Sequence, residues 1–181
     1  LAQFPWSFDW SRERCDHLRR LREAFPDYRL VVELRHASWN TPEVRSLLSS
    51  LELGFCNLDQ PGGRSSISGT AIVTSGAAYV RFHGRNHKAW MDPKSSVAER
   101  YNYLYSLEEL KPWVERIRGM EAEEVFVIAN NHFQGKALAN ALELKAMLTG
   151  RPVEAPETLV RAYPDLQAMA RQAPTQPDLF R

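Results

Sequence analysis

Three short polar segments in this chain combine acids, bases and amides at positions where they could do chemistry. Each segment directly follows an apolar run that is typical of a buried strand. The segments are Glu33-Leu34-Arg35-His36, Arg81-Phe82-His83-Gly84-Arg85 and Asn130-Asn131-His132. Polar side chains at the carboxyl ends of parallel strands form the sites of α/β enzymes. We therefore expect the three segments to meet in one pocket.

The spacing within two of these segments predicts shared orientation. Glu33 and Arg35 are two residues apart on a predicted strand, so their side chains point to the same side, and Arg81 and His83 repeat this spacing. Arginine offers a planar fork for carboxylate or phosphate, so these arginines and Arg85 predict a small anionic ligand. Glu33 is a candidate general base and His83 a candidate proton shuttle. The alternative is an interior salt-bridge layer in which Glu33 only pairs with the arginines.

Four further residues have two interpretations each. Asp59 ends a predicted strand and is a third candidate catalytic residue, or only a turn residue. The amides of Asn130 and Asn131 could bind a hydroxyl-rich substrate, or could start a turn. His36 could be a base in the site, or could only hydrogen-bond within its loop.

Aromatic residues are expected around the mouth of this pocket. They could stack on a sugar or a base, or could pack on the rim. These residues are Trp39, Trp90, Tyr101 and Tyr103. Together with the amides and arginines, they favour a phosphorylated or carboxylated polyhydroxy compound as the substrate.

A divalent metal is left open as a cofactor. Carboxylate and imidazole groups follow several of the predicted strands and could act as its ligands. The candidates are Glu33, His36, Asp59, His83 and His132. The chain has no His-x-x-x-His or Cys-x-x-Cys spacing, so no residue is assigned as a metal ligand.

Composition favours an ordinary globular domain. The 181 residues are 44% hydrophobic and 25% charged, which is enough to bury a core. The net charge of +1 gives no global argument for nucleic-acid or membrane binding, so a nucleic-acid partner stays open. Cys15 and Cys56 are two isolated cysteines, which are typical of reduced core thiols. No apolar run reaches the length of about 18 residues that a membrane span needs, and no signal peptide is recognisable. We therefore expect no membrane partner and a cytoplasmic location.

Strands and helices are predicted to alternate along the chain. Apolar β-branched runs predict strands at 1–4, 30–34, 55–58, 79–82 and 125–128. Helical patterns cover 10–25, 41–53, 106–120 and 134–148, with one or two short helices in 156–170. Gly54 is expected to end the second helix, and Pro112 suggests a later start for the third. Loops are expected at 60–75, with a short strand near 71–73, and at 83–105.

The alternation predicts a parallel α/β sheet. No glycine-rich nucleotide fingerprint appears, which argues against a nucleotide-binding doubly wound sheet. A (β/α)8 barrel typically needs about 250 residues, so five units look like units four to eight. The chain opens inside a predicted strand without Met, and we expect three units to be missing before Leu1. The prediction is a TIM-type (β/α) barrel domain at 1–171, lacking its first strands, and a mobile tail at 172–181.

The same segments resemble the YecE-like family, also called domain of unknown function 72. The matching stretches are Gln3-Phe4-Pro5, Val32-Glu33-Leu34-Arg35-His36-Ala37-Ser38-Trp39, Tyr79-Val80-Arg81-Phe82-His83-Gly84-Arg85, Tyr101-Asn102-Tyr103 with Trp113, and Asn130-Asn131-His132 ahead of Gly135-Lys136-Ala137. The resemblance implies a TIM-type barrel whose first strands are absent here, and it supplies no reaction. It adds Gln3 to the candidate substrate-binding residues, which are otherwise Arg35, His36, Trp39, Arg81, Arg85, Tyr103, Asn130 and Asn131. The family often has an acid where His132 stands, which weakens the case for that residue.

The C-terminal segment suggests a different class of function. Gln176-Pro177-Asp178-Leu179-Phe180 is similar to the peptide that bacterial replication proteins insert into the sliding clamp. Leu179 and Phe180 would anchor in an apolar groove, and Gln176 would supply a hydrogen bond. On this alternative the protein is an accessory of DNA metabolism. The segment could also fold back over an apolar patch.

Overall fold

One parallel sheet organises the fold. A computed structural model describes residues 1–63, 65–67 and 69–172. The strands of the sheet are β1 (Ala2–Gln3), β2 (Val31–Glu33), β3 (Gly54–Asp59), β4 (Ala77–Phe82) and β5 (Glu124–Ala129). All neighbours pair in parallel in the order β1-β2-β3-β4-β5. The predicted parallel α/β sheet is confirmed, and its order has none of the reversal that defines a doubly wound sheet.

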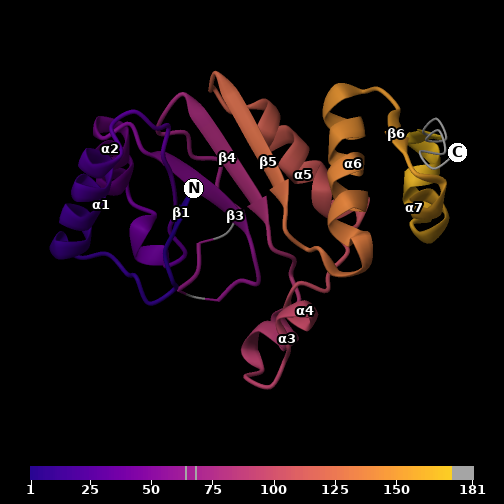
Figure 1. Ribbon diagram of the computed structural model, residues 1–181, viewed down its shortest axis with the longest axis horizontal. Coiled ribbons are helices and arrows are strands. Elements are labelled where there is room, and N and C mark those ends of the chain that lie inside the picture. Colours follow the sequence, from indigo (N-terminus) through magenta and orange to yellow (C-terminus); the bar gives the residue numbers. More distant parts are fainter. Residues whose placement is uncertain (64, 68, 173–181) are drawn as a thin grey trace, which may run out of the picture.

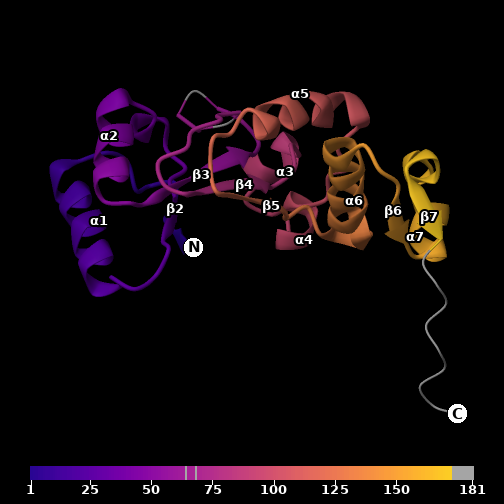
Figure 2. The same ribbon diagram turned by 90° about the horizontal axis from the view of Figure 1, so that it is seen from above.

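Helices connect the strands and also form the C-terminal part. The helices are α1 (Arg12–Ala24), α2 (Pro42–Ser50), α3 (His87–Met91), α4 (Val97–Arg100), α5 (Leu107–Arg118), α6 (Lys136–Thr149) and α7 (Glu157–Ala162), with 3-10 turns η1 (Ala37–Trp39), η2 (Phe133–Gly135) and η3 (Pro164–Ala168). A second, two-stranded sheet pairs β6 (Val153–Ala155) with β7 (Ala170–Gln172). Helices α1 and α2 lie at one end of the main sheet, and α5 and α6 lie at the other (Figure 1, Figure 2). Helices α3 and α4 project beyond the carboxyl ends of β4 and β5 (Figure 1).

Alternate residues of each strand divide the sheet into two faces. One face carries the core shared with the helices: Val32 and Phe55 pack in one apolar cluster, and Val80 and Phe82 pack in another. The opposite face, which we call the inner face, carries a smaller cluster of Val31, Cys56 and Leu58 with Tyr79 packed against it. By the same alternation, Glu33 and Arg81 belong to the inner face.

The helix boundaries follow local capping chemistry. Thr41 caps α2 through its side chain, and Ser106 and Glu109 form the predicted capping box of α5. The suggested later start of α5 is wrong, because this box fixes the start at Leu107 and the helix accommodates Pro112.

Gly54 has a different role from the one predicted. It begins β3 instead of ending α2. A Cβ atom at this position would lie 2.9 Å from Val31 Cγ2 and 3.0 Å from the Ala77 carbonyl oxygen. Close approach to β2 and β4 therefore requires glycine here.

Two predicted loops differ from their predicted secondary structure. The loop expected at 83–105 includes α3 and α4, which Asn86 and Ser96 cap through their side chains. The strand expected near 71–73 is wrong, because the Asn57 side chain takes the hydrogen bonds of the Ile72 backbone. Strands β6 and β7 were not predicted, and β7 includes Gln172, which lies in the predicted tail.

Among the helices of the described part of the chain, none is both long and apolar enough to cross a membrane.

Candidate functional site

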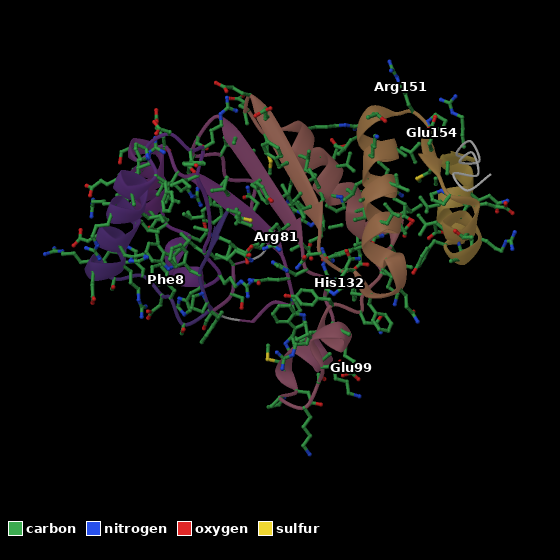
Figure 3. The ribbon with its side chains drawn as sticks, in the orientation of Figure 1. Phe8, Arg81, Glu99, His132, Arg151 and Glu154 are labelled. Atoms are coloured by element: carbon green, nitrogen blue, oxygen red, sulfur yellow. The ribbon has the colours of Figure 1, made fainter. Side chains whose placement is uncertain are left out.

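Glu33 is the centre of a polar cluster on the inner face of the sheet. Its side chain is fully buried at the carboxyl end of β2. Arg35 donates to Glu33 Oε1 from Nε at 2.8 Å and approaches it with Nη2 at 2.6 Å. Arg81 Nη1 donates to Glu33 Oε2, which Gln3 Nε2 also reaches at 3.3 Å. Arg81 lies near the middle of the molecule, where the strands end (Figure 3).

The environment of Glu33 keeps its carboxylate charged. Burial by itself would raise the pKa of Glu33, because a charge is costly to remove from water. The approach of His83 and the positive charges of Arg35 and Arg81 outweigh that penalty, and the pKa of Glu33 lies well below its usual range. Glu33 is therefore an anion at any physiological pH.

His83 completes the cluster as a buried imidazole. Its Nδ1 lies 3.2 Å from Asn130 Nδ2, and a side-chain amide nitrogen can only donate. The proton of the neutral ring is therefore on Nε2, which lies 3.5 Å from Glu33 Oε1. Burial lowers the pKa of His83, and the nearby Glu33 offsets only part of that effect. At 3.5 Å from Glu33 Oε1 the Nε2 donor makes only a long contact with the carboxylate, and it has no shorter hydrogen bond among the described residues.

Aromatic rings from the α3–α4 segment cover His83. The rings of Trp90 and Tyr101 lie 6.2 Å and 5.9 Å from the imidazole, centre to centre, and 5.6 Å from each other. Trp90 Nε1 donates to the Arg100 carbonyl at 2.8 Å, which fixes the indole. His132 packs on Tyr101 at 5.3 Å and is exposed at the rim, beyond the end of β5 (Figure 3).

The charges of the cluster do not cancel. Two guanidinium groups face one carboxylate, and the pKa of His83 favours its neutral form. Arg81 Nε is buried without an acceptor among the described residues. Arg35 uses Nε and Nη2 for Glu33, which leaves its Nη1 available for a further acceptor. The cluster thus combines a surplus positive charge with unused donors.

Asp59 lies on the opposite face of the sheet. Its backbone pairs with Phe82, which packs against the helices, and not with Arg81. Its carboxylate accepts hydrogen bonds from Trp113 Nε1 at 2.5 Å and from the Tyr105 hydroxyl at 2.8 Å. Arg85 also donates to it, from Nε at 2.8 Å and from Nη2 at 2.6 Å. The structure therefore does not bring Asp59 or Arg85 to Glu33, and their contacts join β3 to α5.

Two predicted substrate-binding residues near the first strands have structural contacts. Trp39 is fully buried in the core shared with the helices, where its indole donates to the Phe8 carbonyl at 2.6 Å and its ring stacks on Phe8 at 5.4 Å. His36 caps η1, because its Nδ1 accepts from the Ser38 backbone. The loop interpretation of His36 agrees with these contacts.

Two predicted residues of the later loops also bond within the protein. Asn131 is fully buried and donates to the Tyr103 carbonyl and to Asn140 Oδ1, each at 2.8 Å. The Tyr103 hydroxyl donates to Glu109 at 2.5 Å, and burial together with this carboxylate raises the pKa of Tyr103 to about 12. Of the predicted site residues, the cluster brings together Gln3, Glu33, Arg35, Arg81, His83 and Asn130.

Two further predictions concern a divalent metal site and a sliding-clamp peptide. Within the described ranges, no three His, Cys, Asp or Glu side chains converge closely enough to hold a metal ion, so the five candidate ligands do not form one site. Gln176, Leu179 and Phe180 lie outside the described residues, and the sliding-clamp interaction stays a prediction.

The sequence did not point to Trp6 or Gln60. Both line a cavity of about 350 Å³ that also reaches Arg35 and Trp90. Each follows the end of a strand, β1 for Trp6 and β3 for Gln60. The signal in the sequence that could have identified them is their position shortly after the end of a strand.

Comparisons with known proteins identify similar chains. The family model described as "Protein of unknown function DUF72" matches residues 1–164. The UPF0759 protein YunF of Bacillus subtilis is 30% identical over 159 residues, which are 82% of this chain and 56% of that protein. The crystal structure of a DUF72 family protein from Thermotoga maritima matches with 40% identity and a TM-score of 0.75, covering 81% of this chain and 56% of that one. A second, from Enterococcus faecalis, matches with 29% identity and a TM-score of 0.75, covering 81% and 57%. The chain thus spans little more than half the length of these relatives.

Replacing Glu33 tests whether the buried carboxylate holds the cluster together. Glu33→Gln leaves Arg35 and Arg81 without their anion, so we expect the free energy of unfolding at pH 7 to fall by about 3 kcal/mol. The pKa of Glu33 is lower in the folded state, so its contribution is present above the unfolded value of about 4.3 and is lost at lower pH. Urea titrations at pH 7, 5 and 3 should therefore show the difference from wild type shrinking at pH 3. Glu154→Gln, at an exposed site, is the control, with an effect within about 0.5 kcal/mol. An equally harmless Glu33→Gln would contradict the pairing.

The pKa of His83 tests whether its buried imidazole is coupled to the Glu33 carboxylate. We expect NMR titration to give a pKa below the ordinary value of about 6.5, because burial disfavours the imidazolium. The unfolded state then binds a proton that the folded state refuses, so this stability is lost as the pH falls below about 6.5. Glu33→Gln should lower the pKa of His83 further, because Glu33 stabilises the charged ring. An unchanged pKa of His83 in that variant would show that the two groups are not coupled.

Proposed function

The chain belongs to the DUF72 family of proteins of unknown function, and on that premise we propose that it binds a small anionic, phosphorylated or carboxylated compound at the Glu33 cluster. The observation that carries the proposal is the excess of cationic over anionic side chains around one buried carboxylate. A bound oxyanion would balance this charge and would accept from donors that the protein leaves unused.

The proposed binding mode uses Arg35 as the accessible donor. The Arg35 side chain is 21% exposed, whereas that of Arg81 is 11% exposed. Glu33 already holds one edge of the Arg35 guanidinium group, so the group is oriented before a ligand arrives. A preordered guanidinium loses less side-chain entropy on binding, which favours affinity.

His83 is the better candidate for proton transfer in this proposal. A carboxylate whose pKa is far below neutrality is a weak general base, so the predicted catalytic role of Glu33 becomes one of orienting Arg35 and Arg81. His83 has a titratable ring in the same cluster, with Nδ1 held by Asn130 and Nε2 facing Glu33 Oε1 at 3.5 Å.

The proposal also includes a TIM-type barrel in the longer family members. Its support is the unreversed strand order and the location of the helices on one face of the sheet. Within the described residues β5 pairs only with β4, and Phe126 and Ile128, which pair with the inner-face residues Tyr79 and Arg81, are 43% and 38% exposed. Further strands would cover these side chains in a closed barrel.

Binding of a phosphorylated probe tests the proposal directly. Calorimetry with ribose 5-phosphate should detect binding to the wild-type chain, and uncharged ribose should bind at least about tenfold more weakly. Arg35→Gln should weaken ribose 5-phosphate binding by about 10- to 100-fold, which corresponds to the loss of one charged hydrogen bond.

Arg151→Gln provides the matched control for that experiment. Arg151 is exposed and lies far from Arg81, on the loop before β6 (Figure 3). Its replacement removes the same charge and should leave the affinity unchanged. Equal weakening by Arg35→Gln and Arg151→Gln would reduce the effect to net charge and would contradict a site at the cluster.

A further inference from the structure

The cavity beside the Glu33 cluster has a defined wall and a suitable size. Its volume is about 350 Å³, which is within the range of small-molecule sites. Segments that follow four successive strands line it: Trp6 after β1, Arg35 after β2, Gln60 after β3, and Trp90 with Met91 in α3 after β4. The cavity thus lies at the carboxyl ends of the strands, where Arg35 joins it to Glu33.

The wall of this cavity is mainly apolar. Trp6 and Met91 are 52% and 58% exposed, and both lie on the wall of this one cavity together with Trp90. The Trp6 indole packs edge-on against the His36 ring, with the ring centres 5.1 Å apart. Exposed apolar side chains that gather beside charged groups are typical of a ligand site.

The polar groups of the wall narrow the choice of ligand. Gln60 is buried and its Nε2 already donates to the Ile67 carbonyl at 2.8 Å. Trp90 Nε1 likewise donates to the Arg100 carbonyl. Besides Arg35, the wall has the hydroxyl-bearing side chains of Ser65 and Ser66, and the rest of it is formed mainly by Trp6, Pro61, Trp90 and Met91. A flat aromatic ring therefore finds more contact surface here than a hydroxyl-rich sugar.

We propose that this cavity binds the aromatic ring of an anionic compound whose phosphate or carboxylate lies against Arg35. The inference rests on the proposed function and names its substrate class, because Arg35 belongs both to the cavity wall and to the Glu33 cluster. The ring lies between the segments that carry Trp6 and Trp90. The anionic group accepts from Arg35 Nη1, which Glu33 leaves unused.

Two probes and two variants test this inference. Calorimetry should show that 2-naphthyl phosphate binds at least about tenfold more tightly than ribose 5-phosphate, because the naphthyl ring buries apolar surface against the indoles. Trp6→Leu should weaken 2-naphthyl phosphate at least about fivefold and leave ribose 5-phosphate unchanged. Trp10→Leu is the matched control, because Trp10 is 51% exposed, close to the 52% of Trp6, and does not line the cavity. It should change neither affinity.

The outcomes separate this inference from the proposed function. Equal affinity for the two probes, with no effect of Trp6→Leu, would overturn the aromatic site and leave anion binding intact. Tight 2-naphthyl phosphate binding that Arg35→Gln does not weaken would overturn the placement of the anionic group. Absence of binding by either probe would overturn the proposed function, and the inference with it.

Discussion

A carboxylate without access to water must be paired with cations, and this requirement for Glu33 organises the inner face of the sheet. An uncompensated buried charge would cost several kcal/mol, so Arg35 and Arg81 have to remain in place. Gln3 on β1 and Arg81 on β4 reach the same carboxylate from different strands. Asn130, directly after β5, holds His83 against it from the other side. Glu33 therefore connects strands that are far apart in the sequence.

Two buried carboxylates on opposite faces of the sheet show what distinguishes a candidate site from a structural anchor. Asp59 receives its charge partner and two neutral donors from the protein, and Arg85 continues to Glu109. This group has one cation for two carboxylates and so offers no surplus positive charge, and its contacts join β3 to α5. Glu33 has one more cation than it needs and lies beside a cavity. The imbalance, and not burial itself, makes the Glu33 face the better candidate for ligand binding.

Local patterns predicted the part of the site that depends on a single strand. Two-residue spacing placed Glu33 with Arg35 and Arg81 with His83, and the structure brings all four together. It could not place Asp59, because the register that pairs Asp59 with Phe82 depends on how two strands align. Burial of Trp39 and Asn131 depends on partners far away in the sequence, Phe8 and Tyr103 among them. The strands could be predicted from local patterns in the same way. The role of Gly54 could not, because the need for glycine there comes from the close approach of the neighbouring strands.

Crystals soaked with tungstate would show most directly whether the inner face is an anion site. Tungstate has the charge and hydrogen-bonding capacity of a phosphate-like oxyanion, and its anomalous scattering locates it without ambiguity. We expect a peak within hydrogen-bonding distance of Arg35, with the pair of Glu33 and Arg81 retained beneath it. Peaks only at surface arginines such as Arg151, with Arg35 unaltered and unoccupied, would contradict an anion site at the Glu33 cluster.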